Sequence, residues 1–210
     1  MKLARTTLFG IFILALAFGA GCSNPADDKA EAKVGEETPA VPVGSGERYA
    51  FAEGSKVSFE GSKVTGSHEG GFNEFTGEVM LVDSDPTKSS VSVEINLPSV
   101  WSDHPKLTEH LKSTDFFAVD YYKLSTFQSS KIVREGEQYT VSGNFQLHGV
   151  VRNISFPATI TVEPGKVTVN AEFFIKRFDF DMEFAGPADN LIRDEVVIKL
   201  ELIAEPAEAA

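Results

Sequence analysis

The residues best suited to chemistry gather in one stretch, residues 103–127, which reads DHPKLTEHLKSTDFFAVDYYKLSTF. It contains two of the four histidines of the chain, His104 and His110, together with Asp103 and Asp115. Histidine with carboxylates suits a metal centre or an acid–base site. The two histidines are six residues apart, and a helical step of about 100° per residue places them on different sides of a helix. No HxH, HxxxH or HExxH pattern occurs either, so we expect no metal site.

A hydrolase is the sharper catalytic hypothesis for the same region, because Ser102 lies next to Asp103 and His104. No GxSxG elbow frames a serine, however, which disfavours a nucleophile. A second carboxylate pair, Asp179 and Asp181, falls on one face of an expected strand, about 6–7 Å apart. That spacing suits a glycosidase, but four large apolar residues occupy the opposite face, so a solvated surface is the simpler interpretation. The sequence therefore predicts no catalytic residues and no enzyme.

Alternation of apolar and polar residues with a period of two dominates the chain from residue 49 onward. In SVSVEINL, for example, the apolar residues 91, 93, 95 and 97 share one face, as a half-buried strand requires. Similar runs are SKVSFEG, FTGEVMLVD, YTVSGNFQLH, ISFPATITV, KVTVNAEFFI, FDFDMEF and EVVIKLEL. Glycine-rich and proline-rich turns separate them. They predict an all-β antiparallel domain of about eight strands, either a closed barrel or a sandwich.

One segment, PKLTEHLK at residues 105–112, breaks the alternation. Pro105 suits the first turn of a helix, and Leu107 and Leu111 share a helical face. A short helix between strands is a common way to cap a barrel, so we expect this one at a barrel mouth.

The first 21 residues form a lipoprotein-type signal pattern, in which Lys2 and Arg5 precede a short apolar run and then small residues. The run is too short for a confident membrane span. The sequence GAGC ends at Cys22, the only cysteine of the chain, and resembles a bacterial lipobox with Gly19 where leucine is usual. We therefore expect cleavage before Cys22 and its acylation, with palmitate among the chains, as a membrane anchor. The alternative is a plain signal peptide that leaves a free cysteine.

Residues 22–48 read as a flexible acidic linker, rich in Ala, Glu, Pro and Gly and without apolar periodicity. We expect it to hold the domain, residues 49–206, away from the bilayer. The formal net charge of −12 disfavours nucleic acid as a partner. The expected location is the periplasmic or another extracytoplasmic face of a membrane. Ser23 stands where an aspartate retains enterobacterial lipoproteins in the inner membrane, which favours the outer membrane.

Phenylalanine is abundant, with 17 in the chain, and most of those beyond the leader fall on the apolar faces of the expected strands. An eight-stranded barrel is either filled by its own side chains or holds one small ligand. The apolar faces carry no ionisable group, which favours a cavity for a long hydrocarbon. A ligand-free barrel with a solid phenylalanine core is the alternative.

The domain resembles the YceI family of bacterial periplasmic polyisoprenoid-binding proteins over residues 51–205. The resemblance rests on the hairpin at 62–81 and on HLKSTDFFAVDYYKLSTFQS, YTVSGNFQLHGVVRNISFP, FIKRFDFDM and DEVVIKLEL. It implies a lipocalin-like antiparallel barrel holding an amphipathic polyisoprenoid, such as a prenyl quinone or prenyl phosphate, without catalysis or cofactor. Two departures are visible: Lys112 replaces a common arginine, and Asp181 stands where many members have glycine.

The functional prediction is therefore a lipid-anchored protein of the cell envelope that binds, stores or transports a polyisoprenoid. An envelope hydrolase using residues 103–115 and a ligand-free stress-response barrel are the alternatives, and homodimerisation is left open. Lys112 and Arg152 are the predicted head-group contacts. The predicted cavity lining consists of Phe59, Phe75, Val93, Ile95, Trp101, Leu107, Leu111, Phe116, Phe117, Phe145, Leu147, Phe156, Phe173, Phe178 and Phe180.

Overall fold

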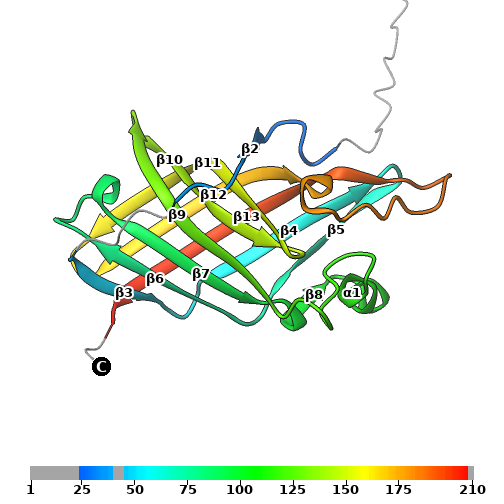
Figure 1. Cartoon of the computed structure of the whole chain (residues 1–210), viewed down its shortest axis with the longest axis horizontal. Helices are drawn as coiled ribbons and strands as arrows, with labels where there is room; N and C mark the ends of the chain where they lie inside the picture. Colours follow the sequence, from blue (N-terminus) through cyan, green and yellow to red (C-terminus); the bar gives the residue numbers. More distant parts are fainter. Residues whose placement is uncertain (1–23, 40–44, 208–210) are drawn as a thin grey trace, which may run out of the picture.

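The computed structural model describes residues 24–39 and 45–207 of the chain. These residues form an elongated antiparallel β-barrel with a short helix, α1, at one end (Figure 1). The predicted signal segment and Cys22 lie outside the described residues. The strands are β1 (Ala30–Glu31), β2 (Lys33–Gly35), β3 (Glu47–Phe51), β4 (Lys56–Lys63), β5 (Gly66–Phe72), β6 (Phe75–Leu81), β7 (Ser90–Asn96), β8 (Val100–Ser102), β9 (Leu124–Glu135), β10 (Gln138–Leu147), β11 (Val150–Glu163), β12 (Lys166–Lys176) and β13 (Ile192–Pro206).

The barrel closes through a ring of neighbouring strands. Strands β3 and β4 lie end to end along β13, and β5 and β6 pair back on them as one long bent hairpin. Strand β7 pairs with β6 and β8 with β5, on either side of the 3-10 turn η2 (Leu97–Ser99). The order then runs through β9, β10, β11 and β12, and β12 closes on β13. If β3 with β4, β5 with β6 and β7 with β8 are each counted as one bent strand, the barrel is closed and has eight strands in chain order. This confirms the predicted fold.

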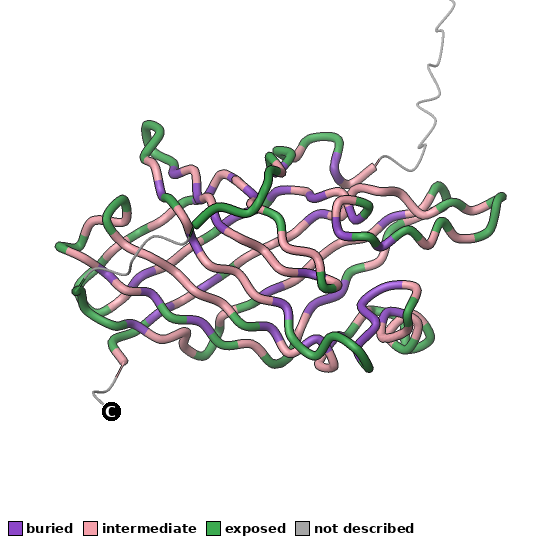
Figure 2. Tube along the Cα trace, in the orientation of Figure 1, coloured by how far each residue is buried: buried purple, intermediate pink, exposed green. Residues whose placement is uncertain are grey.

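Most of the barrel strands follow the predicted alternation, because one face of each strand is turned toward the interior. Figure 2 shows buried positions recurring along these strands and exposed residues at the turns. Strand β9 was not predicted, since Ser125 and Ser129 occupy inward positions where apolar residues are expected. The Ser125 hydroxyl donates to the Gln146 carbonyl, and the Ser129 hydroxyl accepts from the Val91 amide at 2.9 Å. These bonds satisfy the buried polar groups.

The helix α1 (Pro105–Lys112) has the predicted bounds, with Pro105 in its first turn. Leu111 is buried, and the chain beyond the helix folds back so that Phe116 and Phe117 are buried as well. The Phe117 amide donates to the Leu111 carbonyl at 3.0 Å, which fixes this return. The segment from α1 to Val119 thus covers one end of the barrel, as predicted.

The prediction of a strand over residues 178–184 is wrong. The chain there forms a 3-10 turn, η3 (Arg177–Phe180), and Asp181 follows with a left-handed φ of 56°. An alternating pattern alone does not distinguish a strand from a tight turn that buries Phe180 and Met182. Asp179 and Asp181 therefore do not share a strand face, and the spacing argued for a glycosidase pair does not apply.

The predicted linker, residues 22–48, is also corrected over its described part. Residues 30–31 pair with β12, residues 33–35 pair with β11, and Ala26 and Ala32 are buried. The sequence concealed this because two alanines and one valine, Val34, make too short a pattern to read as strands. Residues 24–39 are therefore part of the barrel wall and are not a free tether.

Close packing of aromatic rings on glycine makes Gly70 a sensitive position in β5. A Cβ atom there would lie 2.5 Å from Cζ of Phe59 and 2.6 Å from the carbonyl oxygen of Trp101. The second contact is with backbone, which cannot rotate away. We expect Gly70→Ala to lower the free energy of unfolding by about 1–3 kcal/mol in urea titrations.

The matched control is Gly61→Ala in β4, where a Cβ atom would meet nothing within 4 Å. We expect this variant to unfold like the parent or at slightly higher urea, since alanine restricts the unfolded chain. Equal effects of the two substitutions would show that the Phe59–Gly70 contact does not limit stability.

Candidate functional site: an apolar barrel cavity

The barrel encloses two apolar chambers that lie next to each other. The main chamber runs along the middle of the barrel, and the space between its walls amounts to about 1160 Å³, any solvent at its ends included. Its lining is apolar except for Ser58, Ser89 and Ser90. The helix-end chamber lies under α1, and its space measured in the same way is about 760 Å³. The chambers are neighbours, because both are lined by Phe59, Phe72, Ile95, Phe145, Ile175 and Ile198.

The structure places most of the predicted lining residues around these chambers. Phe59, Val93, Ile95, Phe145, Phe156 and Phe173 line the main chamber. Leu111, Phe116, Phe117 and Leu147 line the helix-end chamber. Leu107 lines a separate groove outside it. Their contact with a lipid remains a prediction.

Four predicted lining residues lie elsewhere. Trp101 and Phe178 are large exposed side chains, and the Phe178 ring packs under the Arg177 guanidinium at 4.5 Å. Phe180 is fully buried in the core against Phe145, and Phe75 packs edge-to-face on Phe51. The turn at η3 explains Phe178 and Phe180, since it removes the strand that would have aimed both rings inward.

Neither of the predicted head-group residues lines a chamber. Lys112 lies on the surface of α1, where its Nζ is 3.1 Å from Oε1 of Glu109. Arg152 is exposed on β11. Long cationic side chains keep their charge in water unless a partner draws it inward, and neither residue has such a partner inside the barrel.

The polar side chains of the helix-end chamber are instead Ser62, Ser125, Arg177 and Arg193. Arg177 is 2% exposed, and its guanidinium donates to the backbone carbonyls of Arg193 at 3.0 Å, of Ile192 at 3.3 Å and of Met182. Burial lowers the pKa of Arg177, while the nearby Asp194 acts in the opposite direction. In the sequence, Arg177 stands between two apolar runs. That position was the signal for a buried arginine, and the signal was not recognised.

A groove outside the chambers collects three histidines, His68, His104 and His110. His104 precedes α1 rather than lying within it, so the helical-wheel argument that separated it from His110 does not hold. Each of two histidines is bound to a carboxylate: Nδ1 of His68 lies 2.9 Å from Asp103, and Nε2 of His110 lies 2.7 Å from Asp115. Within residues 24–39 and 45–207, no three His, Cys, Asp or Glu side chains are grouped to hold a metal ion.

The hydroxyl of Ser102 is hydrogen-bonded to backbone and to another hydroxyl. It donates to the His104 carbonyl at 2.9 Å and contacts the Thr108 hydroxyl at 3.0 Å. In the described part of the chain, no serine or threonine hydroxyl is hydrogen-bonded to a histidine ring. These contacts therefore do not include the serine–histidine hydrogen bond that activates a serine nucleophile.

Comparison with known proteins identifies the family. The profile of the YceI-like domain matches residues 50–204. The chain belongs to the YceI-like family. A UPF0312 protein of Yersinia pseudotuberculosis is 31% identical to this YceI-like chain over 155 residues, which cover 74% of the chain and 72% of the relative. A UPF0312 protein of Pectobacterium carotovorum is 30% identical over 139 residues, or 63% of the chain and 71% of the relative.

Solved structures agree with this assignment. BcnA of Burkholderia cenocepacia superposes on the YceI-like chain with a TM-score of 0.63 at 26% identity, covering 71% of the chain and 95% of BcnA. A polyisoprenoid-binding domain from Saccharophagus degradans, implicated in plant cell wall breakdown, also gives a TM-score of 0.63, at 19% identity, covering 77% of the chain and 99% of the domain. Both share the barrel fold.

Proposed function

We propose that this YceI-like barrel binds, stores or transports an amphipathic polyisoprenoid of the prenyl quinone or prenyl phosphate class, without catalysis. The observation that carries the proposal is the pair of neighbouring, almost wholly apolar chambers inside the barrel. Each methylene moved from water into such walls contributes about 0.8 kcal/mol, so several prenyl units support tight binding without polar contacts. The fold shared with a polyisoprenoid-binding domain directs the choice of ligand class.

The proposal is tested by extracting the lipid that copurifies with the protein. The full chain carrying Cys22→Ser is expressed, purified without detergent and extracted with organic solvent for mass spectrometry. We expect about one prenyl lipid per protein. A ligand present at a hundred times its Kd would also raise the free energy of unfolding by about 2.7 kcal/mol, which thermal unfolding detects. A clean extract, together with no thermal shift on adding prenyl quinone or prenyl phosphate, would favour the ligand-free barrel instead.

We also propose that the protein is anchored by acylation of Cys22 at an extracytoplasmic membrane face, the outer membrane in a cell with two membranes. The described residues contain no helix that is both long and apolar enough to cross a bilayer. Cys22→Ser should move the protein from the membrane pellet to the soluble fraction of broken cells. Ser23→Ala, beside the cysteine, should leave it in the pellet. Retention of the Cys22→Ser protein in the pellet would refute the anchor.

A further inference from the structure

The wall of the barrel has one seam that the barrel strands do not close by themselves. Residues 159–163 of β11 pair with residues 166–170 of β12. The remaining parts of the two strands are not paired with each other. Among the ring strands, residues 150–158 of β11 pair only with β10, and residues 171–176 of β12 pair only with β13. The edges formed by residues 150–158 and 171–176 therefore diverge from each other and leave a slit in the wall.

The N-terminal segment, residues 24–39, fills this slit, and we call it the strap. Its strand β1 runs parallel to β12, with Ala30 opposite Phe173, and β2 runs antiparallel to β11, with Val34 opposite Ile154. Between them the Ala32 amide donates to the Phe174 carbonyl at 2.8 Å. The strap thus covers the middle of both free edges, residues 153–155 and 173–174, which would otherwise be exposed.

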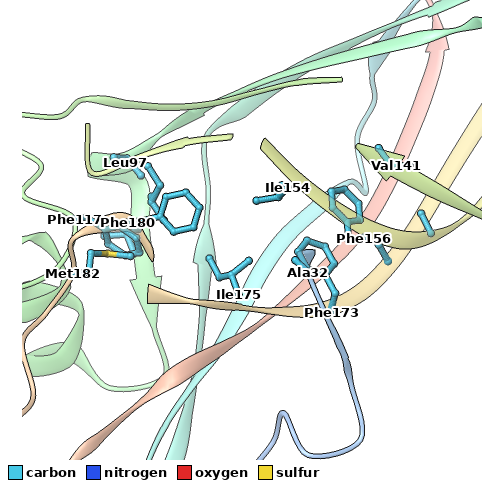
Figure 3. Close-up of a cluster of buried hydrophobic side chains, with 14 of the residues drawn as sticks. Ala32, Leu97, Phe117, Val141, Ile154, Phe156, Phe173, Ile175, Phe180 and Met182 are labelled. Atoms are coloured by element: carbon cyan, nitrogen blue, oxygen red, sulfur yellow. The ribbon is translucent and has the colours of Figure 1, made fainter. Parts of the chain in front are cut away.

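The slit opens directly into the main chamber. Ile154 and Phe156 on β11 and Phe173 and Ile175 on β12 all line that chamber. The rings of Phe156 and Phe173 stack across the slit with centroids 4.2 Å apart. Ala32 is 2% exposed and belongs to the same buried cluster, beside Phe173 in Figure 3. A lipid chain could therefore pass sideways into the chamber once the strap has left and the stacked rings of Phe156 and Phe173 have separated.

The strap is attached through fewer ladder positions than the long strands β9 to β13. Its ladder covers two positions on β12 and three on β11, whereas β12 and β13 pair over ten positions. Its rim is held by the ion pairs Lys29–Glu172 at 3.2 Å and Lys176–Glu31 at 2.6 Å, in which both carboxylates and Lys176 are about half exposed. At its other end the Thr38 amide donates to Oδ1 of Asn144 at 3.0 Å, and the Asn153 side-chain amide donates to the Thr38 hydroxyl at 2.8 Å, both at exposed positions. Exposed pairs stabilise by about 0–1 kcal/mol, and small alanines bury little apolar area. Segments of this kind open locally while the rest of a fold stays intact.

We propose that the strap is a releasable side wall, and that the slit between β11 and β12 is the portal through which the lipid enters and leaves. This inference rests on the proposed function. The strap begins at Asn24, two residues after Cys22, and two residues span at most about 7 Å. With Cys22 acylated, the portal therefore faces the surface of a lipid bilayer, and the barrel is held against the membrane rather than on a long tether.

The competing route is through the barrel end opposite α1, where Pro86 and Ser89 line the main chamber. A disulfide between strap and wall separates the two routes. Lys33 lies directly opposite Ser155 in the antiparallel ladder of β2 and β11, and Lys33 is exposed. Opposite residues in such a ladder have Cα atoms about 4.5–5.5 Å apart, which suits a disulfide.

The experiment uses the full chain with Cys22→Ser and the pair Lys33→Cys and Ser155→Cys, oxidised with diamide. Phosphatidylcholine vesicles carrying either a prenyl quinone or a prenyl phosphate are mixed with the protein and removed by sedimentation at timed intervals. The lipid left on the protein is quantified by mass spectrometry. We expect the oxidised pair to load at least about tenfold more slowly than the same protein reduced with dithiothreitol.

The matched control is Asn170→Cys with Glu201→Cys, an exposed pair that faces across the continuous β12–β13 seam. Its oxidation should leave the loading rate unchanged. A second variant, Ala32→Asp, places a carboxylate at a buried apolar position and should release the strap. We expect it to load and lose lipid faster than the parent and to be cleaved faster by protease within residues 24–39.

The outcomes separate the two proposals. Normal loading rates in the oxidised strap variant overturn the portal and leave lipid binding intact, with the end near Pro86 as the route. Unchanged exchange in Ala32→Asp, despite faster cleavage of the strap, also overturns the portal. No loading of either lipid by the parent and the control overturns the proposed function and the portal together.

Discussion

Replacing Val93 by tryptophan should weaken binding of a prenyl lipid by at least about tenfold while the barrel remains folded. Val93 lies on β7, and its side chain lines the main chamber. An indole in its place would occupy space otherwise filled by the lipid chain. Displacing two methylenes would cost about 1.6 kcal/mol of binding free energy, which corresponds to roughly fifteenfold in Kd. Titration of the purified, delipidated protein with a prenyl quinone and a prenyl phosphate measures the change.

The control for this prediction is Val133→Trp on β9. Val133 is next to the buried Ile132, so that its side chain points to the outer face of the barrel. It adds the same ring without touching either chamber, and we expect binding within about twofold of the parent. Equal affinity of the two variants would argue that the main chamber does not hold the lipid. A loss of cooperative unfolding in Val93→Trp, checked by urea titration, would identify overpacking instead.

Replacing Arg177 by methionine should lower the free energy of unfolding by about 3 kcal/mol, the largest effect on stability that we expect from one substitution. The side chain is 2% exposed and donates to three backbone carbonyls, which tie the turn η3 and residue 182 to the start of β13. Hydrogen bonds from a charged donor contribute about 1.5–3 kcal/mol each, and methionine leaves the buried carbonyls without a partner. Thermal unfolding should show a decrease in Tm of about 6–12 °C.

Arg152→Met is the matched control, because Arg152 is exposed and lines neither chamber. Surface substitutions of this kind change stability by about 0.5 kcal/mol or less. If Arg177→Met is as stable as Arg152→Met, the three carbonyl contacts do not hold the helix-end chamber together. The Arg177→Met protein should also bind lipid less tightly, since residues 177, 182 and 193 all line that chamber.

Alternation along the strands made the antiparallel β class of the domain predictable, while the choice of a barrel over a sandwich came from the family resemblance. Strands such as β7, β10 and β12 bury one face, so apolar residues must recur at every second position, and this pattern can be read without knowing the partners. The bounds of α1 were equally readable, because Pro105 fits only the first turn and Leu107 and Leu111 fall on one helical face. Phenylalanines on the inward faces located most of the cavity wall for the same reason.

The residues around η3 could not be predicted in this way. The run FDFDMEF alternates as a strand does, yet Asp181 adopts a left-handed conformation and Phe180 and Met182 turn into the core. The position of Arg177 is settled by carbonyls that come from β13 and from beyond the turn, at a sequence separation of up to 16 residues. Local pattern carries no information about such partners, so arginine on the surface and arginine in the interior look alike in the sequence.

By itself, the sequence determined that this protein is built of alternating antiparallel strands with a short helix and an apolar interior, and the family resemblance implied a closed barrel. Only the tertiary structure decided the role of residues 24–39. Their few small apolar residues have no periodicity of their own, and they form β1 and β2 because β11 and β12 diverge and leave two free edges. Backbone hydrogen bonds to those edges, together with the burial of Ala32, turn an apparent linker into part of the wall.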